Sequence, residues 1–258
     1  MSDFPRLSEF SVLLTNNNRS KCYLQTLCQN GFIPSSAVVL DAGQKILPEH
    51  TENDLKIHDK TNQKLIQKCP EADLSFDEKE HVVKTLEKYK IKHQTLQTLD
   101  INSKEVIAAV KSCTGDYIVY SGPGGSLLKD EILSVGKLFI HAHPGWLPSF
   151  RGSTTIYYSI LAQQNIACSV ILFTKEIDAG PILHRKKFNL TSPVDLDYIL
   201  DPAIRTATLL EFFQNNSGKN IKALEISKNE FAEENTFYII HPLLKHLSTF
   251  KRNEIIKR

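Results

Sequence analysis

Short apolar runs recur along the chain and alternate with segments that have helical spacing. Runs that are apolar at nearly every position indicate strands buried on both faces of a sheet. Such runs occupy residues 10–15, 37–40, 116–121, 138–140 and 167–173. Helices are predicted from residue 20 to Gly31 and over residues 76–90, 103–112, 153–164 and 201–215. Strands joined through helices predict an α/β fold, with a mostly parallel sheet covered by helices on both faces.

The remaining segments have weaker patterns. Residues 41–75 are polar, so we predict a loop with one helix at 62–68, and interpret the segment as a substrate-side insertion. Short strands are predicted at 93–96, 182–190 and 222–226, followed by a further element at 237–247. The pattern divides the chain into a catalytic domain, residues 1–215, and a C-terminal extension, residues 216–258, that packs on or beside it.

Two histidines follow the buried run at 138–140. Alternation along a strand places His141 and His143 on the same face. The run at 167–173 leads to an acid beside glycine, Asp178-Ala179-Gly180. Ligands of α/β sheets bind beyond the carboxyl ends of the strands, so two imidazoles and a carboxylate there could perform polar chemistry. Each feature also has a structural explanation, because a single histidine at a strand end often has only a structural role and Asp-x-Gly is an ordinary turn signal.

Two further loops follow predicted strands. Asn16, Asn17, Asn18 and Arg19 could hold an anionic substrate group at a helix N-terminus, although asparagine is equally common as a cap or turn residue. Gly122-Pro123-Gly124-Gly125 would let the backbone approach a bulky ligand, or could be a turn without one. The chain lacks Gly-x-Gly-x-x-Gly, so a dinucleotide site is not supported.

Composition narrows the class of protein. The 258 residues are 41% hydrophobic with a net charge of +2, enough for a core but too weakly charged to favour nucleic acid or membrane. No apolar run approaches the ~20 residues of a membrane span, and the N-terminus lacks signal-peptide character. Five scattered cysteines are typical of reduced, buried thiols. We therefore expect a cytoplasmic protein with small-molecule partners and a possible homodimer, without nucleic-acid or membrane partners.

Two motifs carry a resemblance to a known family. The segment HAHPGWLPSFRG resembles the Asn-x-His-Pro-Ser-Leu-Leu-Pro-x-(Phe/Tyr)-Arg-Gly signature of the folate-dependent formyltransferases, and EIDAGPIL resembles their second, Asp-x-Gly signature. Both the gap and the intervening elements fit. The chain departs from the pattern at His141, Gly145 and Trp146, where the family has Asn, Ser and Leu.

The resemblance implies a Rossmann-like formyltransferase fold and transfer of a formyl group from 10-formyl-tetrahydrofolate to a primary amine. In that reaction His143 would be the base and Asp178 would fix its tautomer or organise a relay water. His141 would donate to the oxyanion if the nitrogen facing it carries a proton. The implied folate-binding residues are Gly122, Pro123, Gly124, Gly125, Ile177, Asp178 and Ala179. The implied substrate-binding residues are Asn16, Asn17, Asn18, Arg19, Trp146 and Arg151.

Family members differ in the amine that they formylate. Those acting on methionyl-tRNA carry a large C-terminal domain, which residues 216–258 are too few to supply. Those acting on glycinamide ribonucleotide have a Gly-Ser-Asn phosphate loop, where this chain has Asn16–Ser20. Those acting on amino sugars, often nucleotide-linked, have short and varied tails. An amino sugar is therefore our leading substrate, with the glycinamide-ribonucleotide type as the alternative.

Two other classes remain open. His-x-His at a strand end is a common metal-binding arrangement, and with Asp178 it would give a two-histidine, one-carboxylate site of a metal-dependent hydrolase. Nothing else in the sequence supports it, so we expect no metal. A non-catalytic folate- or sugar-binding relative is the third class, with the change from Asn to His141 as its mark.

Overall fold

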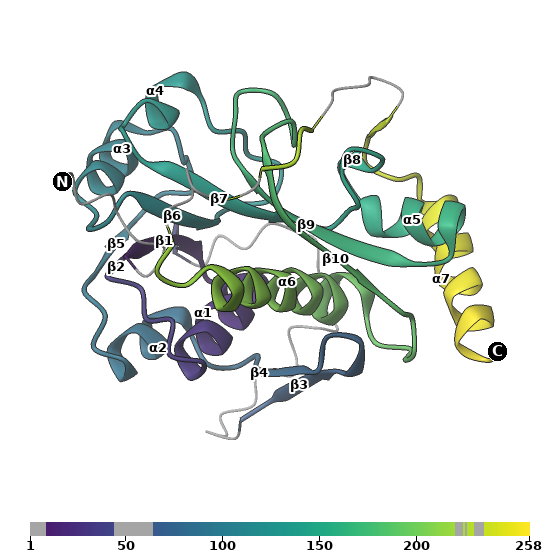
Figure 1. The fold of residues 1–258 in the computed structure, drawn as a ribbon. Helices are drawn as coiled ribbons and strands as arrows, with labels where there is room; N and C mark the ends of the chain where they lie inside the picture. The colour runs from purple at the N-terminus through teal and green to yellow at the C-terminus, as the bar shows by residue number, and fades with distance from the viewer. Residues whose placement is uncertain (1–8, 44–63, 220–223, 225, 230–234) are drawn as a thin grey trace.

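The computed structural model describes residues 9–43, 64–219, 224, 226–229 and 235–258 (Figure 1). A seven-stranded sheet forms its centre. In spatial order the strands are β10 (Ile182–Phe188), β9 (Ile166–Leu172), β7 (Leu138–His143), β6 (Tyr117–Ser121), β1 (Phe10–Thr15), β2 (Ser36–Leu40) and β5 (His93–Leu96). The five strands from β7 to β5 are parallel, whereas β9 is antiparallel to both β7 and β10. The predicted mostly parallel α/β sheet is confirmed.

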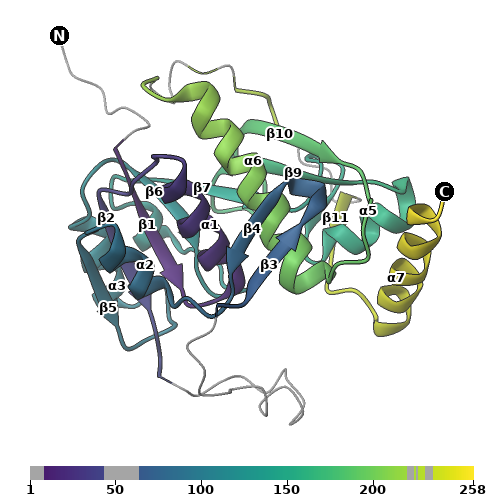
Figure 2. The same cartoon turned by 90° about the horizontal axis from the view of Figure 1, so that it is seen from below.

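Helices cover both faces of the sheet (Figures 1 and 2). Helices α1 (Asn18–Gln29), α2 (Val82–Lys88) and α6 (Asp201–Asn216) pack with one set of strand residues, which includes Phe10, Val12 and Ile140. Helices α3 (Lys104–Lys111) and α4 (Asp130–Leu133) pack with the alternate set, which includes Leu13, Tyr120 and Phe139. Because side chains alternate along a strand, each apolar run supplies both layers of the core.

Several helix starts agree with their sequence signals. The hydroxyl of Ser103 accepts from Val106 N at 3.4 Å and caps α3, and Asn17 Oδ1 accepts from Ser20 N at 2.9 Å and caps α1. Helix α6 begins at Asp201 with Pro202 in its first turn, after a π-helical turn at Leu196–Leu200. These caps satisfy amide groups that a helix leaves without partners.

The prediction for residues 62–90 was partly wrong. Ile66–Cys69 is strand β3, which pairs antiparallel with β4 (Leu74–Asp77) around a 3-10 turn at Pro70–Ala72. The helix expected from Phe76 therefore begins only at Val82, where His81 Nδ1 accepts from Val83 N. Pairing between the two strands overrides the local helical spacing. Residues 44–63, most of the proposed insertion, lie outside the described residues.

The described residues of the C-terminal part form one short strand and one helix. The strand predicted at 222–226 lies mostly outside the described residues, and the element at 237–247 is β11 (Thr236–Phe237) followed by α7 (Pro242–Ile256). Helix α7 packs on α5 (Thr155–Gln163) beyond the β9 side of the sheet (Figure 2). Ser248 Oγ donates to the carbonyl of Tyr157 at 3.1 Å, so the contact is partly polar.

The five cysteines lie in the protein interior. All five cysteines are free and buried, and burial raises the pKa of Cys22, Cys28, Cys69 and Cys168 to about 12, which keeps these thiols protonated. No helix within the described ranges is both long enough and apolar enough to cross a bilayer.

Candidate functional site

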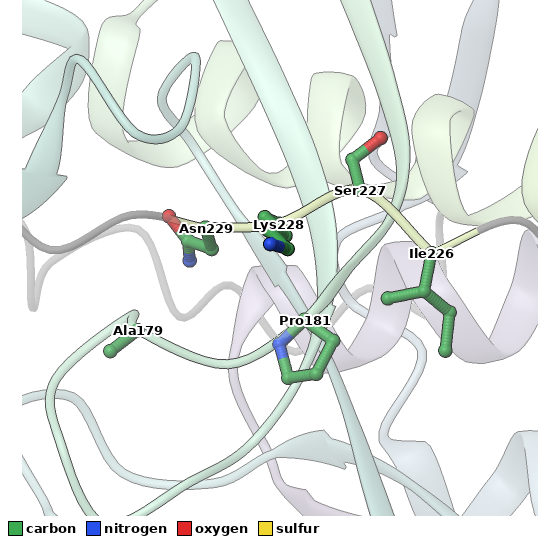
Figure 3. A pocket seen from close by; sticks show the side chains of 6 residues that line it. All are labelled: Ala179, Pro181, Ile226, Ser227, Lys228 and Asn229. Carbon is green, nitrogen blue, oxygen red and sulfur yellow. The ribbon is translucent and has the colours of Figure 1, made fainter.

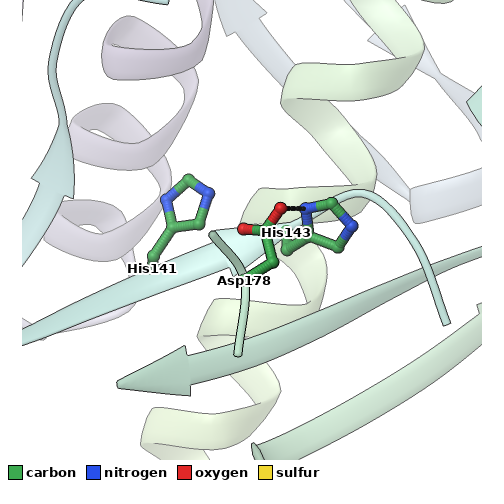
Figure 4. A group of neighbouring side chains, drawn as sticks. All are labelled: His141, His143 and Asp178. Carbon is green, nitrogen blue, oxygen red and sulfur yellow. Dashed lines mark ion pairs between the residues drawn. The ribbon is translucent and has the colours of Figure 1, made fainter. Parts of the chain in front are cut away.

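His141, His143 and Asp178 come together at one place on the sheet (Figure 4). The two histidines lie on the same face of β7, as alternation predicts. One nitrogen from each histidine and one oxygen from Asp178 lie within 4.8 Å of one another. All three side chains are buried, with 9%, 2% and 8% of their residue surfaces exposed. The structure therefore brings together the three residues predicted to be catalytic.

Asp178 reaches the histidines by a route that the sequence did not suggest. We expected it beyond the carboxyl end of a strand that runs alongside β7. Strand β9 instead runs antiparallel, so its last residue, Leu172, pairs with Ile140 rather than lying beyond His143. The connection from β9 to β10 then folds back, with Asp178 in a left-handed conformation at φ 48°. Its Oδ2 accepts from Gly152 N at 3.0 Å and lies 3.3 Å from His143 Nδ1.

Both ring nitrogens of His143 have partners. Nε2 lies 2.8 Å from the carbonyl oxygen of Phe150, which only accepts, so Nε2 carries the proton and donates it. Nδ1 faces the Asp178 carboxyl group, so a hydrogen bond there requires one further proton between the two groups. Burial lowers the pKa of His143, and Asp178 opposes that effect. A proton shared between His143 Nδ1 and Asp178 would satisfy this contact, and neither nitrogen points to open space.

The glycine at position 145 is explained by the same contact. A Cβ atom on Gly145 would lie 2.5 Å from the carbonyl oxygen of Phe150 and 2.8 Å from His143 Nε2. A serine, as in the family signature, would thus displace one of these groups. The loop is also held by Ser169, whose hydroxyl donates to the Gly145 carbonyl at 2.7 Å and accepts from Leu147 N at 3.1 Å. Sequence analysis missed this role of Ser169.

His141 has different surroundings. Its ring stacks on Phe173, with centroids 4.7 Å apart, and lies 6.1 Å from the ring of Tyr120. Its Nδ1 has no hydrogen-bond partner among the described residues. Burial, then Arg205, Arg19 and His143, lower the pKa of His141 well below its ordinary value. His141 is thus a neutral imidazole whose Nδ1 has no partner among the described residues.

Arg205 is a charged group that sequence analysis did not identify. It lies on α6, where its Nε donates to both carboxylate oxygens of Asp201, at 2.9 and 2.8 Å. Its Nη1 donates to the carbonyl of Ala142, the residue between the two histidines, at 2.6 Å. The spacing of four residues between Asp201 and Arg205 on a predicted helix was the available signal. Arg205 fixes the end of β7 and favours neutral imidazoles.

The two loops singled out in the sequence lie side by side, because β1 and β6 are parallel neighbours. Arg19 Nε donates to Ser121 Oγ at 3.0 Å, and its Nη2 donates to the carbonyl of Gly122. Asn16, Asn17 and Asn18 contact Val82 N, Ser20 N and the Tyr198 carbonyl, respectively. The asparagine side chains thus have structural partners, whereas Arg19 connects the two loops.

The side chains of Trp146 and Arg151 have their main contacts outside the histidine pair. Trp146 packs against β10, with Arg185 Cζ 4.4 Å and Lys187 Nζ 4.7 Å from its ring centroid, beside a cavity of about 260 Å³. Arg151 is fully buried, and its Nη2 donates to Asn229 Oδ1 at 3.0 Å. In this conformation Arg151 offers no surface to a substrate. Ile177, beside Asp178, is 46% exposed.

Comparison with known proteins identifies the family. A model of the formyl transferase family matches residues 70–199, half of the chain. The methionyl-tRNA formyltransferase of Thermotoga maritima is 27% identical over 140 residues, which are 52% of this chain and 44% of that protein. The chain belongs to the formyl transferase family, and it matches less than half the length of this curated relative.

Two solved structures show the same fold. A sugar N-formyltransferase from a Shewanella species has a TM-score of 0.51 at 14% identity, covering 95% of this chain and 87% of that one. Glycinamide ribonucleotide transformylase 1 from Symbiobacterium toebii has a TM-score of 0.53 at 13% identity, covering 82% of this chain and 87% of that one. At these identities the likeness establishes the fold alone.

Proposed function

We propose that the protein is an N-formyltransferase that moves a formyl group from 10-formyl-tetrahydrofolate to the primary amine of a small substrate. The observation that carries the proposal is the unpartnered Nδ1 of His141, buried beside the pair of His143 and Asp178. A buried nitrogen without a partner is costly unless a ligand satisfies it. Family membership supplies the reaction class.

Sequence analysis assigned the role of base to His143 and the role of oxyanion donor to His141. The surroundings of the two histidines favour His141 as the base instead. With the ring proton of neutral His141 on Nε2, Nδ1 accepts one proton of the amine nitrogen as this nitrogen attacks the formyl carbon. The carbon–nitrogen bond to the folate then breaks, and the leaving nitrogen takes the proton held between His143 and Asp178. Transfer of the first proton to this pair restores the starting state. Overall, one proton moves from the amine to the folate.

We place the folate between the turn at Gly122–Gly125 and the loop carrying Ile177, Asp178 and Ala179. Ile177 and the glycines at 124 and 125 are exposed, so the loop offers apolar surface to a ligand and the turn offers backbone. For the amine substrate, Arg19 and the Asn16–Asn18 loop lie next to Gly122. Trp146 would belong to a more distant part of a substrate site, and Arg151 would hold its loop.

For the substrate itself we propose an amino sugar, often nucleotide-linked in this family. The sugar N-formyltransferase structure covers nearly the whole chain, and Arg19 is a suitable partner for a phosphate. Glycinamide ribonucleotide is the alternative. We also propose that residues 1–215 form the catalytic domain, with 216–258 as an extension. A cytoplasmic location and a homodimer stay predictions.

Calorimetry and turnover assays test the proposal. Titration with a stable analogue of 10-formyl-tetrahydrofolate should release or absorb heat. Formyl transfer should then be detected with one member of a panel of amino-sugar nucleotides and glycinamide ribonucleotide. Folded protein that binds no folate at about 1 mM, which corresponds to about −4.1 kcal/mol, would exclude the proposal. Folate binding without transfer to any amine would instead indicate a non-catalytic relative.

The same three residues support one second candidate, a metal-dependent hydrolase. Their donor atoms lie close enough together for one ion. The engagement of His143 Nε2 with Phe150 does not prevent Nδ1 from binding a metal. Metal analysis of purified protein and activity with a chelator separate the two functions. A stoichiometric metal, and activity lost with chelator and restored by Zn²⁺, would favour the hydrolase.

A further inference from the structure

The C-terminal extension lies directly on the loop that carries Asp178 (Figure 3). Ser227 and Ile182 exchange both backbone hydrogen bonds, at 3.2 and 3.1 Å, where β10 begins. A cavity of about 350 Å³ is lined by Ala179 and Pro181 from the loop and by residues 226–229 from the extension. Two segments that are far apart in the sequence therefore form one surface beside the proposed catalytic acid.

Asn229 makes the most specific contacts in this surface. Its Nδ2 donates to the carbonyl of Asp178 at 2.7 Å and to the carbonyl of Gly180 at 2.9 Å. Its Oδ1 accepts from Arg151 Nη2 at 3.0 Å. The orientation of the amide follows from chemistry, since carbonyls only accept and a guanidinium only donates. One side chain thus connects the loop of Asp178 with the loop that ends the first signature.

The backbone of the extension also holds the loop that contains Arg151 and Gly152. Strand β11 pairs in parallel with β8 (Arg151–Gly152), and Ser153 N donates to the Phe237 carbonyl at 2.8 Å. Gly152 in turn donates to Asp178 Oδ2. Gly152, the loop residue that donates to the Asp178 carboxylate, is therefore held in place by the extension.

We propose that Asn229 is a positioning residue of the active site, which holds the Asp178 carboxylate at His143 by binding the carbonyls of Asp178 itself and of Gly180, two residues later. The proposal rests on the formyl-transfer function for its kinetic consequences. The extension therefore completes the catalytic unit. The two Nδ2 hydrogen bonds carry the effect on Asp178, and the Arg151 contact orients the amide.

Three variants test which contacts matter. Asn229→Ala removes all three hydrogen bonds, and we expect kcat to fall by about 10- to 100-fold, the range for a displaced catalytic group. Asn229→Asp keeps an acceptor for Arg151 but turns oxygen atoms toward the two carbonyls, so it should be no better than alanine. Lys228→Ala, on the exposed neighbour in the same cavity, should keep the wild-type rate. Recovery of the rate with aspartate would overturn the proposal.

Two measurements separate positioning from general destabilisation. In an Asp178→Asn background, Asn229→Ala should cost no further activity, because residues that act through one group are not additive; a full additional loss would contradict the proposal. Nitrogen NMR of labelled histidines needs no turnover. The His143 signals should change in Asn229→Ala and not in Lys228→Ala, and unchanged signals would contradict the proposal. If wild-type protein transfers no formyl group, the proposed function fails while this result still decides the role of Asn229.

Discussion

The two sides of the central sheet place their functional groups differently. On the side of β1, β2, β5 and β6, parallel strands end together, and the loops at 16–20 and 121–125 meet because their strands are neighbours. On the side of β7, β9 and β10, the acid follows an antiparallel strand and reaches His143 through a returning loop. Local strand geometry places the histidines, whereas contacts between distant segments place Asp178.

This difference separates two kinds of dependence. His141 and His143 are separated by one residue of a buried strand, so their common face follows from the strand itself. Asp178 depends on Gly152 N, on the close packing of Gly180 against Leu172, and on the extension. Substitutions of the two histidines should therefore change the chemistry in an intact fold. Substitutions among the contacts of Asp178 should instead move its carboxylate. The variants below test that division.

The largest effect is expected at His141. If its Nδ1 accepts the amine proton, both His141→Ala and His141→Asn should reduce turnover by about 10²–10⁴-fold. Asparagine can donate or accept a hydrogen bond but cannot take up a proton. Turnover and melting temperature are measured with and without chelator. A strong recovery with asparagine alone would return His141 to an oxyanion-donor role and His143 to the role of base.

A double variant sharpens this result. His141→Asn combined with Gly145→Ser restores two positions of the family signature. The new side chain would displace the contact between His143 Nε2 and Phe150, because a Cβ there lies within 3 Å of both groups. The released Nε2 could act as base. The turnover of the double variant should therefore exceed that of His141→Asn by about tenfold or more, which is part of the usual contribution of a general base. Equal rates for the two variants would contradict this reading of Gly145.

A smaller effect is expected at Gly180, in the loop that places Asp178. A Cβ atom there would lie 1.7 Å from the carbonyl oxygen of Leu172, which is backbone and cannot rotate away. Gly180→Ala should lower the free energy of unfolding by about 1–3 kcal/mol, as overpacking does, and should lower turnover by moving Asp178. Gly124→Ala is the matched control, since nothing lies within 4 Å of its Cβ position. Denaturant unfolding of both proteins measures the difference, and equal stabilities would exclude the close packing.

Sequence analysis identified the parts that follow from local pattern. The apolar runs became strands, Ser103 and Asp201 began helices, and the three residues predicted to be catalytic came together. The direction of β9 was not readable, because a buried run has the same composition whether parallel or antiparallel. The β3–β4 hairpin was missed for a related reason: a short segment of mixed polarity fits either period.

The supporting residues were harder to predict. Ser169, Arg205 and Asn229 each act through contacts with residues far away in the sequence. A serine in a strand, an arginine on a helix and an asparagine in the extension carry no local signal for such roles. The hydrogen bond of His143 Nε2 was equally hard to predict. It forms because the loop folds back and brings the Phe150 carbonyl to the ring.

A shift in pH dependence is expected when the charge on α6 is removed. Arg205 is, after burial, the largest cause of the lowered pKa of His141. Asp201→Asn/Arg205→Gln removes the cation together with its partner, so the pKa of His141 should rise and the acid limb of kcat/KM should move to higher pH. Arg205→Lys keeps the charge and should leave the limb in place. A limb that stays fixed in the charge-free variant would show that another group limits the rate at low pH.

The smallest effect concerns stability. The folded-state pKa of His141 is lowered, whereas unfolded histidine titrates near about 6.5. Below that pH position 141 therefore binds more protons in the unfolded chain than in the folded chain, and this group lowers stability as pH decreases. His141→Asn removes the group, so the melting temperature of the variant should fall less than that of the wild type between about pH 7 and about pH 5.5. Carboxylates titrate mainly below this window, and His81, whose pKa burial also lowers, is present in both proteins. Parallel melting curves would mean that His141 is protonated as easily in the folded protein as in the unfolded chain. His141 could not then be a neutral proton acceptor at the lower end of that pH range.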